Sequence, residues 1–198
     1  DSDDRCVSYT PLPAVRLTMQ QECGPAAGRS REVGMREFVL LASRAQDSVA
    51  DEEYAAFCRF MGLPPARLRR IRLEREPMPQ LDLDSIAGIV VGGSPFTSSD
   101  PRETKSAVQL RVEREIDDLL VEVCDRDTPF LGACYGVGTL GVHLGGIVDT
   151  TYGEPAGAVP VTLTAQGEAD PLLVGVPPTF EAYVGHKEAL QAPPPGTV

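Results

Sequence analysis

Hydrophobic and polar positions follow two different periods along the chain, and the two periods alternate. Short apolar runs at 37–42 and 86–91 are typical of buried strands, and a segment of helical periodicity follows each of them. The strongest helical pattern follows Asp100, where the face opposite the apolar positions is charged. We expect Asp100 to be the N-cap, with Pro101 in the first helical position and Glu103 completing a capping box. The apolar face of this helix consists of Val108, Val112, Ile116, Leu119, Leu120 and Val123.

The same reading predicts the remaining elements. They are a helix over 47–61 with Val49, Tyr54, Phe57 and Phe60 as its apolar positions, a strand over 68–73, a strand over 128–133, a helix over 135–144, and strands over 159–163 and 180–184. Strands and helices alternate up to about residue 147, which implies right-handed crossovers. We therefore expect an α/β fold with a mainly parallel sheet and helices on both faces.

The two ends of the chain differ from this pattern. Residues 1–34 mix Asp, Arg, Gly, Pro and Ser without a sustained period, which predicts a disordered or accessory extension before a single domain over 35–198. Met35 is a candidate for the true start of that domain. At the other end, residues 193–198 are typical of a turn with no closing strand, so we expect the fold to be incomplete at its C-terminus.

Composition excludes several classes of function. The net charge of −11 is spread along the 198 residues, which argues against a nucleic-acid or anionic-membrane surface. Five cysteines without a close pair and two histidines favour neither a disulfide framework nor a zinc site, and they fit a reducing cytosol. No apolar stretch reaches the roughly 18 residues that span a bilayer. The sequence thus predicts a cytoplasmic protein with no metal, no cofactor, no nucleic-acid partner and no membrane partner.

The candidate chemistry lies in the segment Pro129–Gly136, where a Gly-x-Cys-x-Gly turn directly follows an apolar run. This pattern is typical of a nucleophile elbow, in which glycines permit a strained turn between a strand and a helix. Cys134 would be exposed at a helix N-terminus, where unpaired amides favour the thiolate. The alternative interpretation is that Cys134 is a small buried hydrophobic residue beside a tight turn.

A second glycine motif, Gly92-Gly93, follows the predicted strand 86–91. Active sites of α/β sheets lie beyond the carboxyl ends of the strands, which is where Gly93 and Cys134 are both expected. The backbone amides of Gly93 and Tyr135 would then form an oxyanion hole for a tetrahedral intermediate. A glycine pair taken alone is more often simply a turn.

These motifs resemble those of the class I glutamine amidotransferases, and most closely the GMP-synthase-type and free-standing members. Pro129–Gly136 matches the family signature Pro-x-Leu-Gly-x-Cys-Tyr-Gly, and residues 92–95 are similar to its Gly-Gly-Pro loop with Ser94 inserted. The resemblance covers about residues 36–196. Later segments that resemble the family in order are 144–146, 153–157, 170–172 and 176–177.

The resemblance implies a flavodoxin-like fold and a glutaminase reaction. Cys134 would attack the side-chain amide of glutamine, release ammonia and leave a γ-glutamyl thioester for water to hydrolyse. The ammonia would pass to a synthetase or another acceptor subunit. The sequence departs from the family at Gly138, where the GMP-synthase type has a glutamine residue that helps to hold the substrate. This departure counts against specificity for glutamine as the substrate.

The family also has a histidine that activates the cysteine and a glutamate that orients the histidine. His186 and Glu188 spell this His-x-Glu pair. In the other interpretation, residues 186–190 with Pro195-Gly196 resemble an earlier His-x-Asp segment of the family. The catalytic pair would then lie in a continuation of roughly 40 residues that completes the sheet.

Two other functions stay open at this point. One is a γ-glutamyl hydrolase that uses the same thiolate on another γ-glutamyl compound. The other is a catalytically inactive amidotransferase-like protein with a binding or regulatory role, since a nucleophile without its base loses orders of magnitude in rate.

Overall fold

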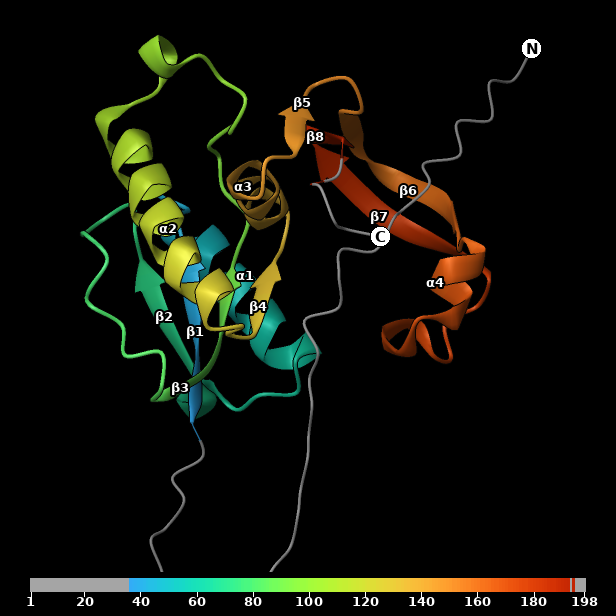
Figure 1. Cartoon of the computed structure of the whole chain (residues 1–198), viewed down its shortest axis with the longest axis horizontal. Coiled ribbons are helices and arrows are strands. Elements are labelled where there is room, and N and C mark those ends of the chain that lie inside the picture. The colour runs from blue at the N-terminus through green and yellow to red at the C-terminus, as the bar shows by residue number, and fades with distance from the viewer. Residues whose placement is uncertain (1–35, 193, 195–198) are drawn as a thin grey trace, which may run out of the picture. The chain divides into compact units, whose positions relative to one another are not determined.

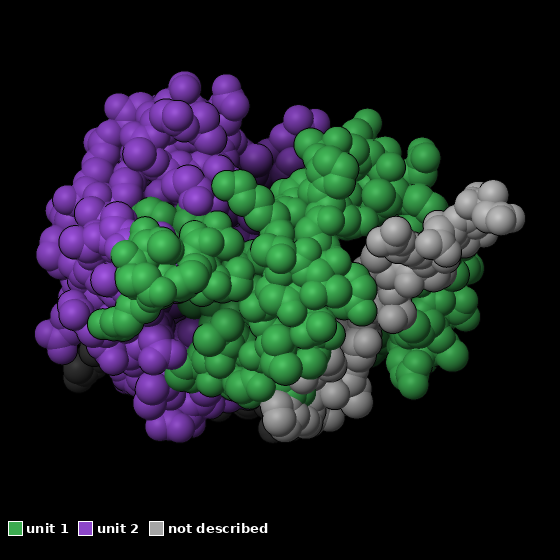
Figure 2. Space-filling model, turned by 90° about the horizontal axis from the view of Figure 1, so that it is seen from above, with its two compact units in different colours: residues 1–14, 96–104, 137–198 green, residues 15–95, 105–136 purple. Residues whose placement is uncertain are grey.

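The computed structural model describes residues 36–192 and 194. The expectations for residues 1–34, for Met35 and for the turn at Pro195-Gly196 lie outside the described residues. The chain divides into two compact units, which are shown in Figure 2 and described separately below. Of the described residues, unit 2 comprises 36–95 and 105–136, and unit 1 comprises 96–104, 137–192 and 194.

Unit 2 is built on a parallel sheet of four strands in the order β2-β1-β3-β4. The strands are β1 (Glu37–Ala42), β2 (Leu68–Arg72), β3 (Ile86–Val91) and β4 (Phe130–Gly132). Two long helices, α1 (Asp47–Phe60) and α2 (Ala107–Asp125), connect them. In Figure 1, α2 passes in front of the sheet and α1 behind it, which confirms the expected α/β fold with helices on both faces.

Both faces of the central strands are buried, as the continuous apolar runs predict. On β1, Leu40 and Ala42 belong to a core cluster that includes Leu68 and Val90. The cluster packs against Phe38, Tyr54, Phe57, Cys58, Met61 and Leu63. Because successive strand residues point to opposite faces, Val39 and Leu41 serve the other side of the sheet, where they are also buried.

Two expected apolar positions were wrong, one on each helix. Phe60 is 80% exposed, because it lies in the last turn of α1, just before Gly62 ends the helix with φ +64. Val108 is 38% exposed, because it lies in the first turn of α2. The deeper positions of α2 are correct, since Val112, Ile116, Leu120 and Val123 are buried.

The N-terminus of α2 also corrects the sequence prediction. Ser106 is the N-cap, and its hydroxyl accepts a hydrogen bond from the amide of Gln109 at 3.1 Å. The segment that begins with Pro101 forms only a single 3-10 turn over Arg102–Thr104, closed by the Thr104 amide on the Pro101 carbonyl at 2.9 Å. The N-cap of α2 therefore lies six residues beyond the predicted Asp100.

Unit 1 contains shorter elements and two antiparallel pairs of strands. Its elements are most of α3 (Tyr135–His143), β5 (Ile147–Asp149), β6 (Glu154–Thr162), α4 (Ala165–Ala169), a 3-10 turn (Pro171–Leu173), β7 (Thr179–His186) and β8 (Ala189–Ala192). β6 pairs with β7, and β5 pairs with β8. The predicted strands over 159–163 and 180–184 therefore correspond to β6 and β7. Within the described part of the chain, no helix combines the length and the apolar character needed to cross a bilayer.

Candidate active site

Cys134 occupies a strained turn between β4 and α3. Its φ is +55, in the left-handed region that residues other than glycine rarely adopt, and the residue is exposed. The Gly136 amide donates to the Ala133 carbonyl at 3.1 Å and closes the turn around Cys134. A cysteine in positive φ between a parallel strand and a helix has the geometry of a nucleophile elbow.

Gly136 explains why the second glycine of the motif is needed. A Cβ atom added there would lie 2.5 Å from the Val91 carbonyl oxygen and 2.9 Å from the Val91 Cβ atom. Any side chain would therefore push the start of α3 away from β3. The close approach of strand and helix expected from the motif is present.

The sheet register brings Gly93 to the same edge as Cys134. Val91 on β3 pairs with Gly132 on β4, and the Ala133 amide donates to the Val91 carbonyl at 2.9 Å. Gly93 and Cys134 each stand two residues beyond this matched position on neighbouring parallel strands. The structure thus places both at the carboxyl edge of the sheet, where α/β folds hold their sites.

The Gly93 amide has a partner that the sequence does not reveal. It donates to Glu53 Oε1 at 2.9 Å, and the Arg44 Nε atom donates to the same oxygen at 2.9 Å. The Glu53 side chain is only 12% exposed, and its Oε2 atom is buried with no hydrogen-bond partner among the described residues. Glu53 comes from α1 and Arg44 follows β1, so both belong to unit 2 with Gly93 and Cys134.

Sequence reasoning missed Arg44 and Glu53. Arg44 stands two residues beyond the end of the buried strand β1, so the rule that sites gather at carboxyl ends could have identified it. Glu53 offers no comparable signal, because it lies in a polar stretch of α1 and meets Gly93 across 40 residues of sequence.

Tyr135, the second predicted oxyanion donor by its backbone amide, is the first residue of α3. Its side chain is 4% exposed and belongs to the buried part of unit 2. The peptide bond between Cys134 and Tyr135 therefore joins an exposed thiol to a residue fixed in the core. Its role as an oxyanion donor stays a prediction.

The two residues of the predicted His-x-Glu pair make separate contacts within unit 1. His186 Nε2 lies 3.1 Å from the Tyr152 carbonyl oxygen and 3.4 Å from Glu154 Oε2, its register partner on β6. Glu188 instead accepts hydrogen bonds from the amides of Ser98 at 2.6 Å and Ser99 at 2.8 Å. Among the described residues, no hydrogen bond joins His186 to Glu188, so the carboxylate beside the histidine is Glu154.

Gly138 is buried, and its surroundings leave little room for a side chain. A Cβ atom built there would lie 3.4 Å from Ser98 Oγ, 3.6 Å from Val148 Cγ1 and 3.7 Å from Glu188 Oε1. These are ordinary contact distances for one added carbon atom. A side chain as long as glutamine would need one of these neighbours to move.

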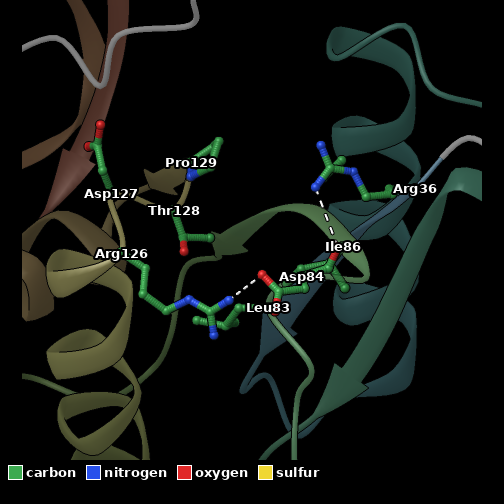
Figure 3. A pocket seen from close by; sticks show the side chains of 9 residues that line it. Arg36, Leu83, Asp84, Ile86, Arg126, Asp127, Thr128 and Pro129 are labelled. Carbon is green, nitrogen blue, oxygen red and sulfur yellow. Dashed lines mark hydrogen bonds and ion pairs between the residues drawn. The ribbon is translucent and has the colours of Figure 1, made fainter.

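A hollow in unit 2 lies at the opposite edge, near the amino ends of β1, β3 and β4 (Figure 3). Arg36, Asp84, Arg126 and Thr128 are among its polar lining residues. Asp84 forms an ion pair with Arg126, and its carbonyl accepts from Arg36 Nη1 at 3.5 Å. The acid thus neutralises the arginine nearest to it, and the hollow is not a strongly cationic site. Residues 36–192 hold no group of three or more His, Cys, Asp or Glu residues that could bind a metal ion.

Comparison with known proteins supports the resemblance. No family model matches the chain. A 72-residue segment is 32% identical to one of the subunits of the glutamine-hydrolyzing GMP synthase of Natronomonas pharaonis and covers 36% of this chain and 38% of that protein. Solved structures similar to this chain include a glutamine amidotransferase from Thermotoga maritima, with a TM-score of 0.60, 16% identity and coverage of 80% of this chain. A glutamine amidotransferase from Methylobacillus flagellatus has a TM-score of 0.58, 18% identity and coverage of 82%.

These likenesses establish the fold. The chain spans 64% of the Thermotoga maritima structure and 59% of the Methylobacillus flagellatus structure. Its parallel sheet with flanking helices is the fold of these glutamine amidotransferases, so the expectation for the fold class is confirmed.

Proposed function

We propose that this chain is a glutamine amidotransferase-type enzyme with Cys134 as its nucleophile. The observation that carries the proposal is the elbow itself: an exposed cysteine at φ +55, with Gly136 seated against Val91, on a fold shared with solved glutamine amidotransferases. A cysteine that served only as a small hydrophobic core residue would need neither an exposed side chain nor a positive φ. Strained backbone of this kind clusters at functional sites.

The proposed reaction has two stages at one sulfur atom. The Cys134 thiolate attacks the side-chain carbonyl carbon of glutamine, and the carbonyl electrons move to oxygen. Backbone amides at Gly93 and Tyr135 would stabilise that oxyanion. As the carbon–nitrogen bond breaks, the nitrogen takes up the proton that the Cys134 thiol gave up on activation, so ammonia leaves and a γ-glutamyl thioester remains. Water then attacks the thioester, glutamate is released and the thiol is restored.

The base that would activate Cys134 is a separate question. His186 and Glu188 were predicted for the activating pair from their spacing alone. The contact of His186 with Glu154 supports a histidine oriented by a carboxylate, although the carboxylate differs from the predicted one. The roles of His186 and Glu188 in catalysis stay predictions.

Released ammonia implies an acceptor. The relative from Natronomonas pharaonis is named as one subunit of a glutamine-hydrolyzing GMP synthase. We infer that a synthetase or another ammonia-accepting subunit is the partner of this chain, and that glutamine or a γ-glutamyl compound is its substrate.

One observation favours a second candidate, a γ-glutamyl hydrolase. Ser98, Val148 and Glu188 border the space beside Gly138, where the GMP-synthase type carries a glutamine side chain. A substrate site shaped by these groups differs from the one the resemblance implies. Comparing ammonia release from glutamine with hydrolysis of γ-glutamyl dipeptides separates the two candidates.

The test compares two exposed cysteines. Cys134→Ala should abolish both ammonia release from glutamine and the covalent adduct with a glutamine-mimicking diazo-ketone, as measured by an ammonia assay and peptide mass mapping. Cys124→Ala is the matched control, because Cys124 is also exposed but partial desolvation and the nearby Asp125 raise the pKa of its thiol. Its loss should change neither readout.

Two outcomes would contradict the proposal. Ammonia release that survives Cys134→Ala would remove the nucleophile assignment. A Cys134 thiol that reacts with iodoacetamide but forms no adduct and releases no ammonia would favour the binding or regulatory alternative.

A further inference from the structure

The contact between Gly93 and Glu53 has a consequence for the proposed reaction. The Gly93 N–H donates to Glu53 Oε1 at 2.9 Å, within the normal range for a full hydrogen bond. An oxyanion at the same amide would need that N–H to point at the substrate oxygen. A carboxylate and an oxyanion also repel each other, so the two cannot share one donor favourably.

Glu53 is held where it is by Arg44. The Arg44 Nε atom donates to the Oε1 atom that accepts from Gly93, and the two side chains are 30% and 12% exposed. Glu53 stands on α1, and Arg44 lies two residues beyond the end of β1, so the pair links the helix to the carboxyl end of the strand. The pair therefore has a defined position at the carboxyl edge of the sheet.

The glycine pair is shaped to receive this carboxylate. A Cβ atom at Gly92 would lie 2.9 Å from Glu53 Oε2, and one at Gly93 would clash first with Arg44 Nη2 and lie 3.2 Å from Glu53 Oε1. A side chain at Gly92 would force the carboxylate to shift, and one at Gly93 would press on it. The Gly92-Gly93 motif thus accommodates Glu53 as well as offering an amide to a ligand.

We propose that Glu53 is a positioning residue that closes the candidate oxyanion site in the resting protein. The proposal rests on the proposed glutaminase function. Substrate binding exchanges the partner of the Gly93 N–H from Glu53 Oε1 to the substrate oxygen. Glu53 keeps its ion pair with Arg44 during this exchange, so its charge stays compensated and only one hydrogen bond is given up.

The test replaces the charge and keeps the shape. Glu53→Gln leaves a neutral oxygen as the acceptor for Gly93, and a neutral acceptor competes less well than a carboxylate. The rate of adduct formation between Cys134 and the glutamine-mimicking diazo-ketone should rise by roughly fivefold. Alkylation of Cys134 by iodoacetamide, which needs no oxyanion donor, should keep its rate. Glu52→Gln, an exposed neighbour on α1, is the matched control and should change neither rate.

The outcomes separate this inference from the function on which it rests. An unchanged or slower adduct rate in Glu53→Gln, with an unchanged iodoacetamide rate, would overturn the inference and leave the nucleophile in place. If neither protein forms the adduct while iodoacetamide still labels Cys134, the proposed function fails and the inference fails with it.

A measurement on the unaltered chain covers the case in which Glu53→Gln does not fold. The amide resonance of Gly93 in a nitrogen-15 NMR spectrum should move when the diazo-ketone adduct forms, because the N–H changes its acceptor. A Gly93 resonance that stays in place on adduct formation would mean that Glu53 keeps this N–H, and would overturn the inference.

Discussion

At the scale of single residues, Cys134 keeps a backbone conformation that costs free energy. A non-glycine residue at φ +55 brings its Cβ atom close to neighbouring backbone atoms, and glycine does not have this conflict. If Cys134 supplies a nucleophilic sulfur atom, the backbone strain at this position is the cost of placing that sulfur atom in the turn. Removing the Cβ atom should then stabilise the protein.

We therefore expect Cys134→Gly to have a free energy of unfolding about 1 kcal/mol higher than that of Cys134→Ala. Chemical denaturation of the two variants measures this difference, because neither carries the thiol. Ala133→Gly is the control, since the backbone of Ala133 does not have positive φ and glycine there should only destabilise. Equal stabilities of Cys134→Gly and Cys134→Ala would show that the turn is not strained.

Some residues of the candidate site could be predicted from a local motif, and others depend on contacts between distant parts of the sequence. The turn at Cys134 and Gly136 was predictable, because it depends on a short local motif whose geometry the glycines permit. Glu53 was not, because its contact with Gly93 depends on how α1 lies relative to the end of β3. His186 and Glu188 are close in sequence, yet one ends β7 and the other lies beyond it, so their side chains reach different partners.

At the scale of elements, periodicity predicted the helices well and their ends less well. The α2 pattern is unambiguous in its middle, where residues at spacings of three and four are buried. Its start was predicted wrongly, because the N-cap is Ser106 and not Asp100.

This choice can be tested by removing each cap. Ser106→Ala should lower the free energy of unfolding by about 1 kcal/mol, because the hydroxyl satisfies the Gln109 amide. Asp100→Ala should change the free energy of unfolding by less than about 0.5 kcal/mol, as for an ordinary surface substitution. Urea denaturation of both variants measures the two effects. A larger loss for Asp100→Ala would restore the N-cap predicted from the sequence.

At the scale of the whole molecule, the alternation of strands and helices predicted the parallel sheet because few topologies satisfy right-handed crossovers. The antiparallel pairs were not predicted beyond their strand-rich pattern. The register of β6 against β7 places Glu154 opposite His186, and no local sequence pattern in either strand predicts that pairing. Long-range pairing of short strands depends on contacts that a single sequence does not display.

Among the described residues, the buried hydrophobic core is distributed unevenly between the two units. The aliphatic and aromatic residues that form the buried core, from Val39 to Tyr135, belong to unit 2. In unit 1, by contrast, Tyr183 is 91% exposed, Val174 81% and Leu172 78%. Buried apolar contacts are what raise the free energy of local opening, and a pair of strands without a covered face is only marginally stable.

We therefore expect the two units to differ in hydrogen exchange under native conditions. Backbone amides of β1 and β3 should be among the last to exchange, with an opening free energy close to that of global unfolding. Amides of β6 and β7 should exchange earlier, because their hydrogen bonds open without exposing a buried core. Mass-spectrometric exchange on peptides from 37–42, 86–91, 154–162 and 179–186 measures this order. Equal protection of the two groups would mean that a further surface covers β6 and β7 in solution, such as the proposed ammonia-accepting partner or a second copy of the chain.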